Sequence, residues 1–150
     1  MEDVLCTISF YLFERIKSFL KLLRKKLYRI GEITMSWDVY LKDEKGNTFS
    51  VPLFKEGGTR LRDGCSKTKL NITYNYSPFY YKYISSQKGL RFLNGKKAKL
   101  VKGILAHAVE NLGIKGDGAY WKSTKGNAGF ALSILLEWVK KYPEGIFEVH

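Results

Sequence analysis

The sequence predicts an α+β fold, a small antiparallel sheet of three to four strands with helices packed on one face, preceded by a long amphipathic N-terminal helix. Two stretches, residues 36–42 and 69–76, alternate between apolar and polar side chains, which is the period of a strand with one buried face. Three others, residues 4–30, 96–112 and 124–142, repeat apolar residues every three or four positions, which is typical of amphipathic helices. No internal repeat divides the chain, so we expect a single domain at residues 35–150 after a basic helical extension at residues 1–34.

The N-terminal helix has an apolar stripe flanked by basic residues, and Gly31 follows it as a stop signal. Three interpretations remain open. The stripe packs on the domain or pairs with a second copy of the chain through residues 16–30; the helix lies on a membrane surface; or it is an extension upstream of Met35. Glu2 and Asp3 argue against a secretory signal, and the apolar run that begins at Val4 is too short to span a bilayer.

The first strand is expected to form a hairpin. Residues 43–47 supply a turn, and residues 49–53 resemble a return strand. Pro52 cannot donate a ladder hydrogen bond, which places this second strand at an edge or ends it early. The glycine-rich loop at residues 55–67 follows, without the spacing of a known phosphate-binding loop.

The strand at residues 69–76 runs into a helix start, with Ser77 fitting an N-cap and Pro78 the first helical position. The next helix is expected from Lys96 to Leu112, and the last begins at Thr124 or Asn127. Residues 146–149 add a short final strand.

The net charge of +12 is concentrated in the middle of the chain, where residues 55–126 hold fifteen Lys or Arg against four acidic residues. Such a field favours polyanionic partners, namely nucleic acid, a nucleoprotein, an acidic protein surface or anionic lipid. The alternative is a solvated surface that is basic without a partner. The candidate residues for binding nucleic acid or a nucleoprotein are Lys96, Lys97, Lys99, Lys102, Arg60, Arg62, Lys122 and Lys125.

Aromatic and small polar side chains accompany these basic residues. The candidates for base stacking or for lining a pocket are Tyr80, Tyr81, Tyr120, Trp121, Asn71, Thr73, Asn75 and Asn127. The same set suits a nucleotide pocket. Tyr80 and Tyr81 point about 100° apart on a helix, so both cannot easily be buried. We expect Tyr74, Tyr76, Phe79 and Trp138 to be core residues.

Catalytic and metal-binding patterns are weak. The two histidines, His107 and His150, have no ligand at metal-binding spacing. The two cysteines, Cys6 and Cys65, form no CxxC motif, which favours a reducing compartment over a disulfide framework. Cys65 has basic neighbours but no identified base. We therefore expect no cofactor, no metal and no catalytic residue, and an enzymatic activity stays an open question.

Short motifs resemble a known group of proteins. They are Trp37-Asp38-Val39-Tyr40-Leu41, Gly57-Gly58-Thr59, Asn71-Ile72-Thr73-Tyr74-Asn75-Tyr76-Ser77-Pro78, Gly89-Leu90-Arg91, Leu93-Asn94-Gly95-Lys96, Tyr120-Trp121, Gly126-Asn127-Ala128 and the apolar run from Ala131 to Leu136 before Pro143. In these motifs the chain from about residue 35 onward resembles small uncharacterised proteins encoded by tailed phages and prophages. The resemblance implies a phage accessory protein and carries no activity or site residue with it.

The function expected from charge, aromatic residues and this resemblance is a basic binding protein in the cytoplasm of a bacterial host. It would inhibit or modulate a nucleic-acid-linked defence system of that host through a lysine-rich surface. The alternative is a nucleotide- or small-molecule-binding protein, with hydrolysis as one option.

Overall fold

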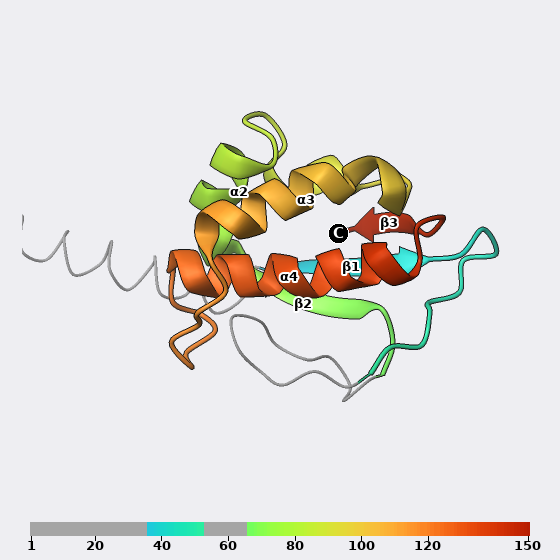
Figure 1. Ribbon diagram of the computed structural model, residues 1–150, viewed down its shortest axis with the longest axis horizontal. Helices are drawn as coiled ribbons and strands as arrows, with labels where there is room; N and C mark the ends of the chain where they lie inside the picture. Colours follow the sequence, from blue (N-terminus) through green and yellow to red (C-terminus); the bar gives the residue numbers. More distant parts are fainter. Residues whose placement is uncertain (1–35, 53–65) are drawn as a thin grey trace, which may run out of the picture. The chain divides into compact units, whose positions relative to one another are not determined.

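The computed structural model describes residues 36–52 and 66–150 (Figure 1). The expected N-terminal helix, the dimer contact through residues 16–30, and Arg60, Arg62 and Cys65 lie outside the described residues. In chain order the elements are β1 (Ser36–Lys42), β2 (Lys69–Thr73), the 3-10 helix η1 (Tyr74–Tyr76), α2 (Ser77–Tyr83), the 3-10 helix η2 (Gly89–Leu93), α3 (Ala98–Leu112), α4 (Lys125–Lys141) and β3 (Ile146–Val149).

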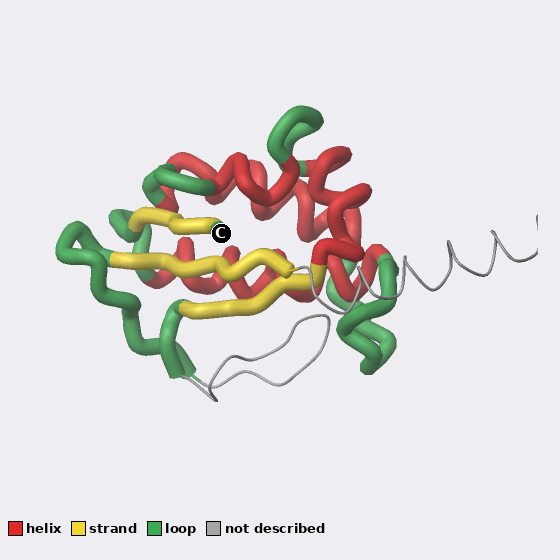
Figure 2. The backbone as a smooth tube through the Cα atoms, turned by 180° about the vertical axis from the view of Figure 1, so that it is seen from behind, coloured by secondary structure: helices red, strands yellow, loops and turns green. Residues whose placement is uncertain are grey.

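The described strands form an antiparallel three-stranded sheet in the order β2-β1-β3. The register pairs Trp37 with Ile72 and Leu41 with Phe147, so these four buried side chains share one face of the sheet. The helices cover that face, as Figures 1 and 2 show from opposite sides. The α+β class, the antiparallel sheet and the short final strand are therefore confirmed.

The expected turn at residues 43–47 is present, closed by the hydrogen bond from the Asp43 N–H to the Asn47 carbonyl at 2.9 Å, but the expected return strand at residues 49–53 is wrong. β1 pairs with β2 and β3 on its two sides, and residues 48–50 make only isolated bridges, Lys42 with Thr48 and Ser50 with Lys67. Both hydrogen-bonding edges of β1 are occupied by strands that are distant in sequence, so the chain after the turn pairs with the residues before β2, with hydrogen bonds from the Thr68 N–H to the Phe49 carbonyl and from the Val51 N–H to the Ser66 carbonyl, both 2.9 Å. The same segment also contacts the residue after α4, where the ring of Phe49 stacks on Tyr142 at a centroid distance of 4.1 Å.

The strand before α2 is shorter than its alternating pattern predicts. It ends at Thr73, whose hydroxyl oxygen accepts a hydrogen bond from the Asn75 backbone N–H at 3.3 Å and caps η1. Tyr76, the last residue of η1, is fully buried. Ser77 is the first residue of α2 and not, as the sequence predicts, its N-cap. The apolar alternation continues past the strand because Tyr74 and Tyr76 of the 3-10 helix, two positions apart, both pack against the core.

The two long helices supply half of the buried apolar side chains of the core. Val101, Leu105 and Ala108 of α3 are buried, and the helix ends at Gly113, whose φ of 71° suits only glycine. In α4, Thr124 is the N-cap, as one of the two expected alternatives, and its hydroxyl accepts from the Asn127 N–H at 3.2 Å. In the part of the chain that the structure describes, no helix is long and apolar enough to cross a membrane.

Candidate functional site

The structure separates the predicted binding residues into two groups at opposite ends of α3. Figure 1 shows β3 and the start of α3 at one end, with α2 and the α3–α4 loop at the other. Because α3 has 15 residues, these ends lie about 21 Å apart. We call Lys96, Lys97, Lys99 and Lys102 the lysine end. We call Tyr81, Tyr120, Trp121, Lys122 and Lys125 the aromatic end.

The lysine end is partly neutralised by an acidic residue that the sequence did not single out. Glu144 Oε2 lies 3.3 Å from Lys97 Nζ, and its Oε1 lies 2.7 Å from Lys99 Nζ. Hydrogen bonds from Lys99 and then Lys97 hold the pKa of Glu144 below its ordinary value. The ammonium of Lys96 lies 4.6 Å from the centroid of the Phe92 ring. The positive charge available to a partner is therefore smaller than four lysines would give.

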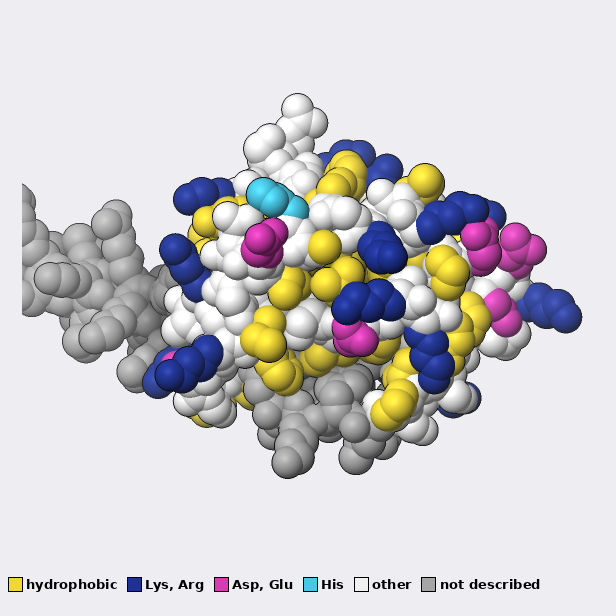
Figure 3. Space-filling view, viewed as in Figure 1, with side chains coloured by type: hydrophobic (Ala, Val, Ile, Leu, Met, Phe, Trp, Pro, Cys, Tyr) yellow, Lys and Arg dark blue, Asp and Glu magenta, His cyan; other side chains and the backbone are white. Residues whose placement is uncertain are grey.

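Two of these lysines lie outside the helix that they were expected to open. Lys96 and Lys97 precede α3 instead of opening it, and Lys97 bridges to Ile146 beside β3. Figure 3 shows basic side chains spread over the α3–α4 face among apolar ones, and they do not gather into one patch there.

The aromatic end is built on the loop that joins α3 to α4. Trp121 is 57% exposed, and its ring lies edge-on to the half-buried Tyr120 at 5.3 Å. The backbone of this pair is held by η1, because Tyr76 Oη donates to the Tyr120 carbonyl and Asn75 Nδ2 donates to the Trp121 carbonyl at 2.6 Å. The indole is thus presented to solvent from an anchored backbone.

Asn127 organises the same loop from beneath. Its side chain is fully buried, and Oδ1 accepts from the Asp117 backbone N–H at 3.0 Å. Its Nδ2 lies within hydrogen-bonding distance of Asp117 Oδ1 (3.0 Å) and of the carbonyls of Ala119 (3.0 Å) and Lys122 (3.2 Å). These contacts use the hydrogen-bonding capacity of the amide within the protein. Asn127 therefore shapes the loop and is not free to contact a ligand.

Asp117 adds an electrostatic contact to this arrangement. The hydrogen bonds from Asn127 and from the Ala119 N–H, with the Lys122 ammonium 3.2 Å away, hold the pKa of its carboxyl below the ordinary value. The carboxylate stays ionised at neutral pH and fixes the side of the loop that carries Lys122.

The first residues of the loop cross the start of α4 at very short range. A Cβ atom at Gly126 would lie 1.9 Å from the Lys115 carbonyl oxygen, and one at Gly129 would lie 1.9 Å from the Gly113 carbonyl oxygen. Only glycine at these two positions permits this approach of backbone to backbone. The sequence around Asn127 is therefore explained by loop packing.

The neighbouring tyrosines of α2 divide as the helix geometry predicts, one buried and one exposed. Tyr80 is fully buried, and its hydroxyl donates to the Ala128 carbonyl at 3.2 Å. Burial raises its pKa well above the ordinary value, so the phenol stays neutral. Tyr80 is a core residue and cannot stack on a partner, which corrects the prediction. Tyr81 is 45% exposed, and its ring lies over Gly89.

The nucleotide alternative requires the polar residues of β2 and η1 to converge with Asn127 in a pocket, and they do not. Asn71 Nδ2 donates to Asp38 Oδ1 at 2.8 Å across the sheet, and Thr73 is buried as the cap of η1. Asn75 is engaged by the loop, with Ser123 Oγ donating to its carbonyl at 2.6 Å. These side chains hold elements together.

The four expected core aromatics are packed as predicted. Tyr76 and Trp138 are buried, while Tyr74 and Phe79 are half-buried against the core. Tyr74 also carries a contact that the sequence did not reveal. Its hydroxyl lies 3.5 Å from Arg91 Nη2. The only sequence signal for Arg91 is its charge, since the contact joins residues 17 positions apart.

Among the described residues, no group of three or more His, Cys, Asp or Glu side chains is placed to hold a metal ion. His107 is exposed beside Asn111, and His150 Nε2 lies 2.6 Å from Glu148 Oε1.

A comparison with protein families, with characterised proteins and with solved structures finds no match to this chain.

Proposed function

We propose that this chain is a nucleic-acid-binding protein that stacks unpaired bases on its aromatic end and meets phosphates with the basic side chains around it. The observation that carries this proposal is Trp121, a large aromatic side chain 57% exposed on a loop whose backbone is anchored on two sides. An exposed indole in an anchored loop contributes little to the core, and it suits a surface that a partner covers.

The anchored loop backbone reduces the loss of conformational entropy when a base binds to Trp121. The contacts of Asn75, Tyr76 and Asn127 with the loop exist without a partner, so the loop backbone need not be ordered when a base arrives. Stacking of one base on an aromatic side chain contributes about 1–3 kcal/mol and tolerates any base. Because paired bases are covered on both faces within a duplex, this surface favours single strands.

The charge distribution supports phosphate contacts at the same end. Within the described residues, no carboxylate forms an ion pair with Lys115 of the α3–α4 loop or with Lys125 at the start of α4, whereas Lys122 is paired with Asp117. Residues 66–150 carry fourteen Lys or Arg against five acidic residues. Binding driven by such contacts falls as salt rises, because condensed counterions are released.

The biological role that we propose is inhibition or modulation of a nucleic-acid-linked defence system in a bacterial host, exerted by covering the nucleic acid or nucleoprotein that the system uses. The support for this role is the resemblance of the motifs to tailed-phage accessory proteins together with the basic surface. In a nucleoprotein complex the lysine end supplies a second contact, about 21 Å from the first.

Trp121→Ala is expected to weaken binding of a labelled single-stranded oligonucleotide about tenfold, because one stacking platform is lost. The measurement is fluorescence anisotropy at fixed salt. The control is Leu100→Ala, which removes another exposed apolar side chain (69% exposed) near the lysine end and should leave binding unchanged.

The thermal midpoint should be unaltered in both variants. Unchanged affinity in Trp121→Ala, or a large drop in its thermal midpoint, would show that the indole stabilises the fold and does not serve recognition.

A further inference from the structure

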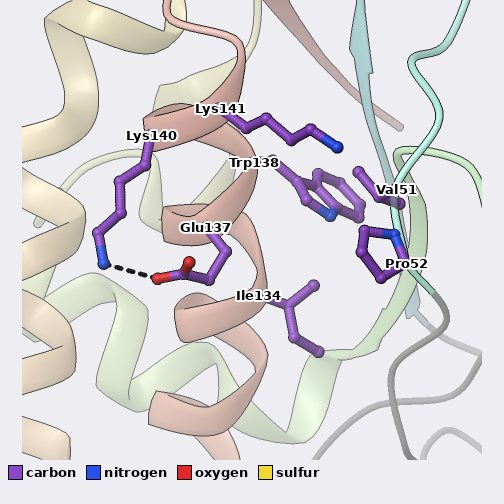
Figure 4. A pocket seen from close by; sticks show the side chains of 7 residues that line it. All are labelled: Val51, Pro52, Ile134, Glu137, Trp138, Lys140 and Lys141. Carbon is purple, nitrogen blue, oxygen red and sulfur yellow. Dashed lines mark hydrogen bonds and ion pairs between the residues drawn. The ribbon is translucent and has the colours of Figure 1, made fainter.

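A second site lies beside the C-terminal half of α4, away from the aromatic end. A pocket of about 490 Å³ is lined by Val51, Pro52, Ile134, Glu137, Trp138, Lys140 and Lys141 (Figure 4). Trp138 lies 13 residues after Lys125 on α4, so the pocket and the aromatic end are about 20 Å apart. Its volume falls within the range of about 300–1,000 Å³ that is usual for small-molecule sites.

One wall of the pocket is the helix and the other is an anchored piece of chain. Ile134, Trp138 and Lys141 recur at helical spacing on α4 and face Val51 and Pro52. The opposite wall is held by the hydrogen bond from the Val51 N–H to the Ser66 carbonyl at 2.9 Å.

The same wall is also fastened to the end of α4. Tyr142 Oη donates to the Ser50 carbonyl, and the ring of Tyr142 stacks on Phe49. With both walls fixed by contacts of their own, the pocket is formed before a ligand enters.

The charges at the rim are unequal. Lys140 Nζ lies 2.6 Å from Glu137 Oε1, so these two charges offset each other. Lys141 forms no ion pair with a carboxylate of the described residues, and Figure 4 shows its side chain reaching over Trp138 towards Val51. Among the described residues, the pocket therefore combines an apolar interior with an ammonium group that pairs with no carboxylate and lies 5.3 Å from the centroid of the Tyr142 ring.

We infer that this pocket binds a small organic acid, with an aromatic or alicyclic body against Trp138, Ile134 and Pro52 and its carboxylate paired with Lys141. The body removes apolar surface from water, and the carboxylate replaces water on the ammonium with a charge-assisted hydrogen bond. This inference is independent of nucleic-acid binding at the aromatic end.

The test uses indole-3-acetate as the probe and indole-3-acetamide as its neutral counterpart, in two-dimensional ¹H–¹⁵N spectra of the full chain. Indole-3-acetate should shift the indole N–H signal of Trp138 in a saturable way and leave that of Trp121 in place. The neutral amide should bind more weakly at the same position.

Two variants separate the charge from the apolar interior. Lys141→Gln should weaken indole-3-acetate binding about three- to fivefold and leave the amide unaffected. Ile134→Phe should reduce binding of both probes by filling the pocket. The matched control is Lys102→Gln, an exposed lysine on α3, which should change neither affinity. The spread of the amide signals reports that each variant is folded.

Three results would overturn the inference. They are no shift at Trp138, equal binding of acid and amide, and shifts at Trp138 that depend on protein concentration without a probe, which would place a second copy of the chain over the pocket.

Discussion

Gly129→Ala is expected to lower the free energy of unfolding by about 3 kcal/mol. The added methyl carbon would lie 1.9 Å from the Gly113 carbonyl oxygen and 2.9 Å from Leu112 Cβ, so either the loop or the helix must move. Both neighbours belong to the end of α3 or the first residue after it, and neither is the far end of a flexible side chain. Urea unfolding followed by circular dichroism measures the change.

The matched control is Gly103→Ala on α3. Nothing lies within 4 Å of a Cβ at Gly103, which is an exposed helix position. Here alanine should raise the free energy of unfolding by about 0.5–1 kcal/mol, because glycine is the poorer helix former. The two substitutions are chemically identical and should have opposite signs. A neutral Gly129→Ala would mean that the loop does not cross α4 as described.

Asn127→Ala is expected to lower the free energy of unfolding by about 2 kcal/mol and to weaken binding of single-stranded nucleic acid. The substitution leaves the Asp117 N–H and the Ala119 and Lys122 carbonyls without their buried partner. Solvent reaches part of this loop and can hydrogen-bond to some of these groups. The loss of stability is therefore smaller than the loss expected if all of them stayed unpaired. The loop that carries Trp121 would lose its hydrogen bonds to Asn127, so the indole would be held less firmly for stacking.

Asn111→Ala is the control for that variant. Asn111 is exposed on α3 and its side chain donates to the His107 carbonyl at 2.8 Å, so its removal should change stability by less than about 0.5 kcal/mol. Unfolding curves and oligonucleotide anisotropy measure both variants. If Asn127→Ala kept full stability and full affinity, the anchored loop would not be the basis of recognition.

Local signals predicted the helices well because caps and stops act over a few residues. Gly113 ends α3 as the sequence indicates, and Thr124, one of the two alternatives that the sequence offered, is the N-cap of α4. The partner of β1 was mispredicted for the opposite reason. A turn after β1 favours a local hairpin, whereas the pairs Trp37 with Ile72 and Leu41 with Phe147 join segments 35 or more positions apart. Nothing in a short window reports such pairing.

In the candidate site too, local features could be predicted from the sequence and contacts between distant residues could not. The burial of Tyr80 and the exposure of Tyr81 follow from helix geometry, because adjacent helical residues point about 100° apart. The offset of Lys97 and Lys99 by Glu144 joins positions more than 40 residues apart. The burial of Asn127 beneath the loop depends on how tightly the chain packs on Gly126 and Gly129. These contacts decide which predicted residues are free to bind, and they follow from tertiary structure.

We propose above that the aromatic end binds unpaired bases and phosphates. The most direct test is the anisotropy of labelled single-stranded and duplex oligonucleotides with the full chain at about 50 mM and about 200 mM salt. We expect the single strand to bind more tightly than the duplex, with an affinity that falls steeply between the two salt concentrations. Absence of binding at the lower salt concentration, or equal affinity for both forms, would contradict the claim.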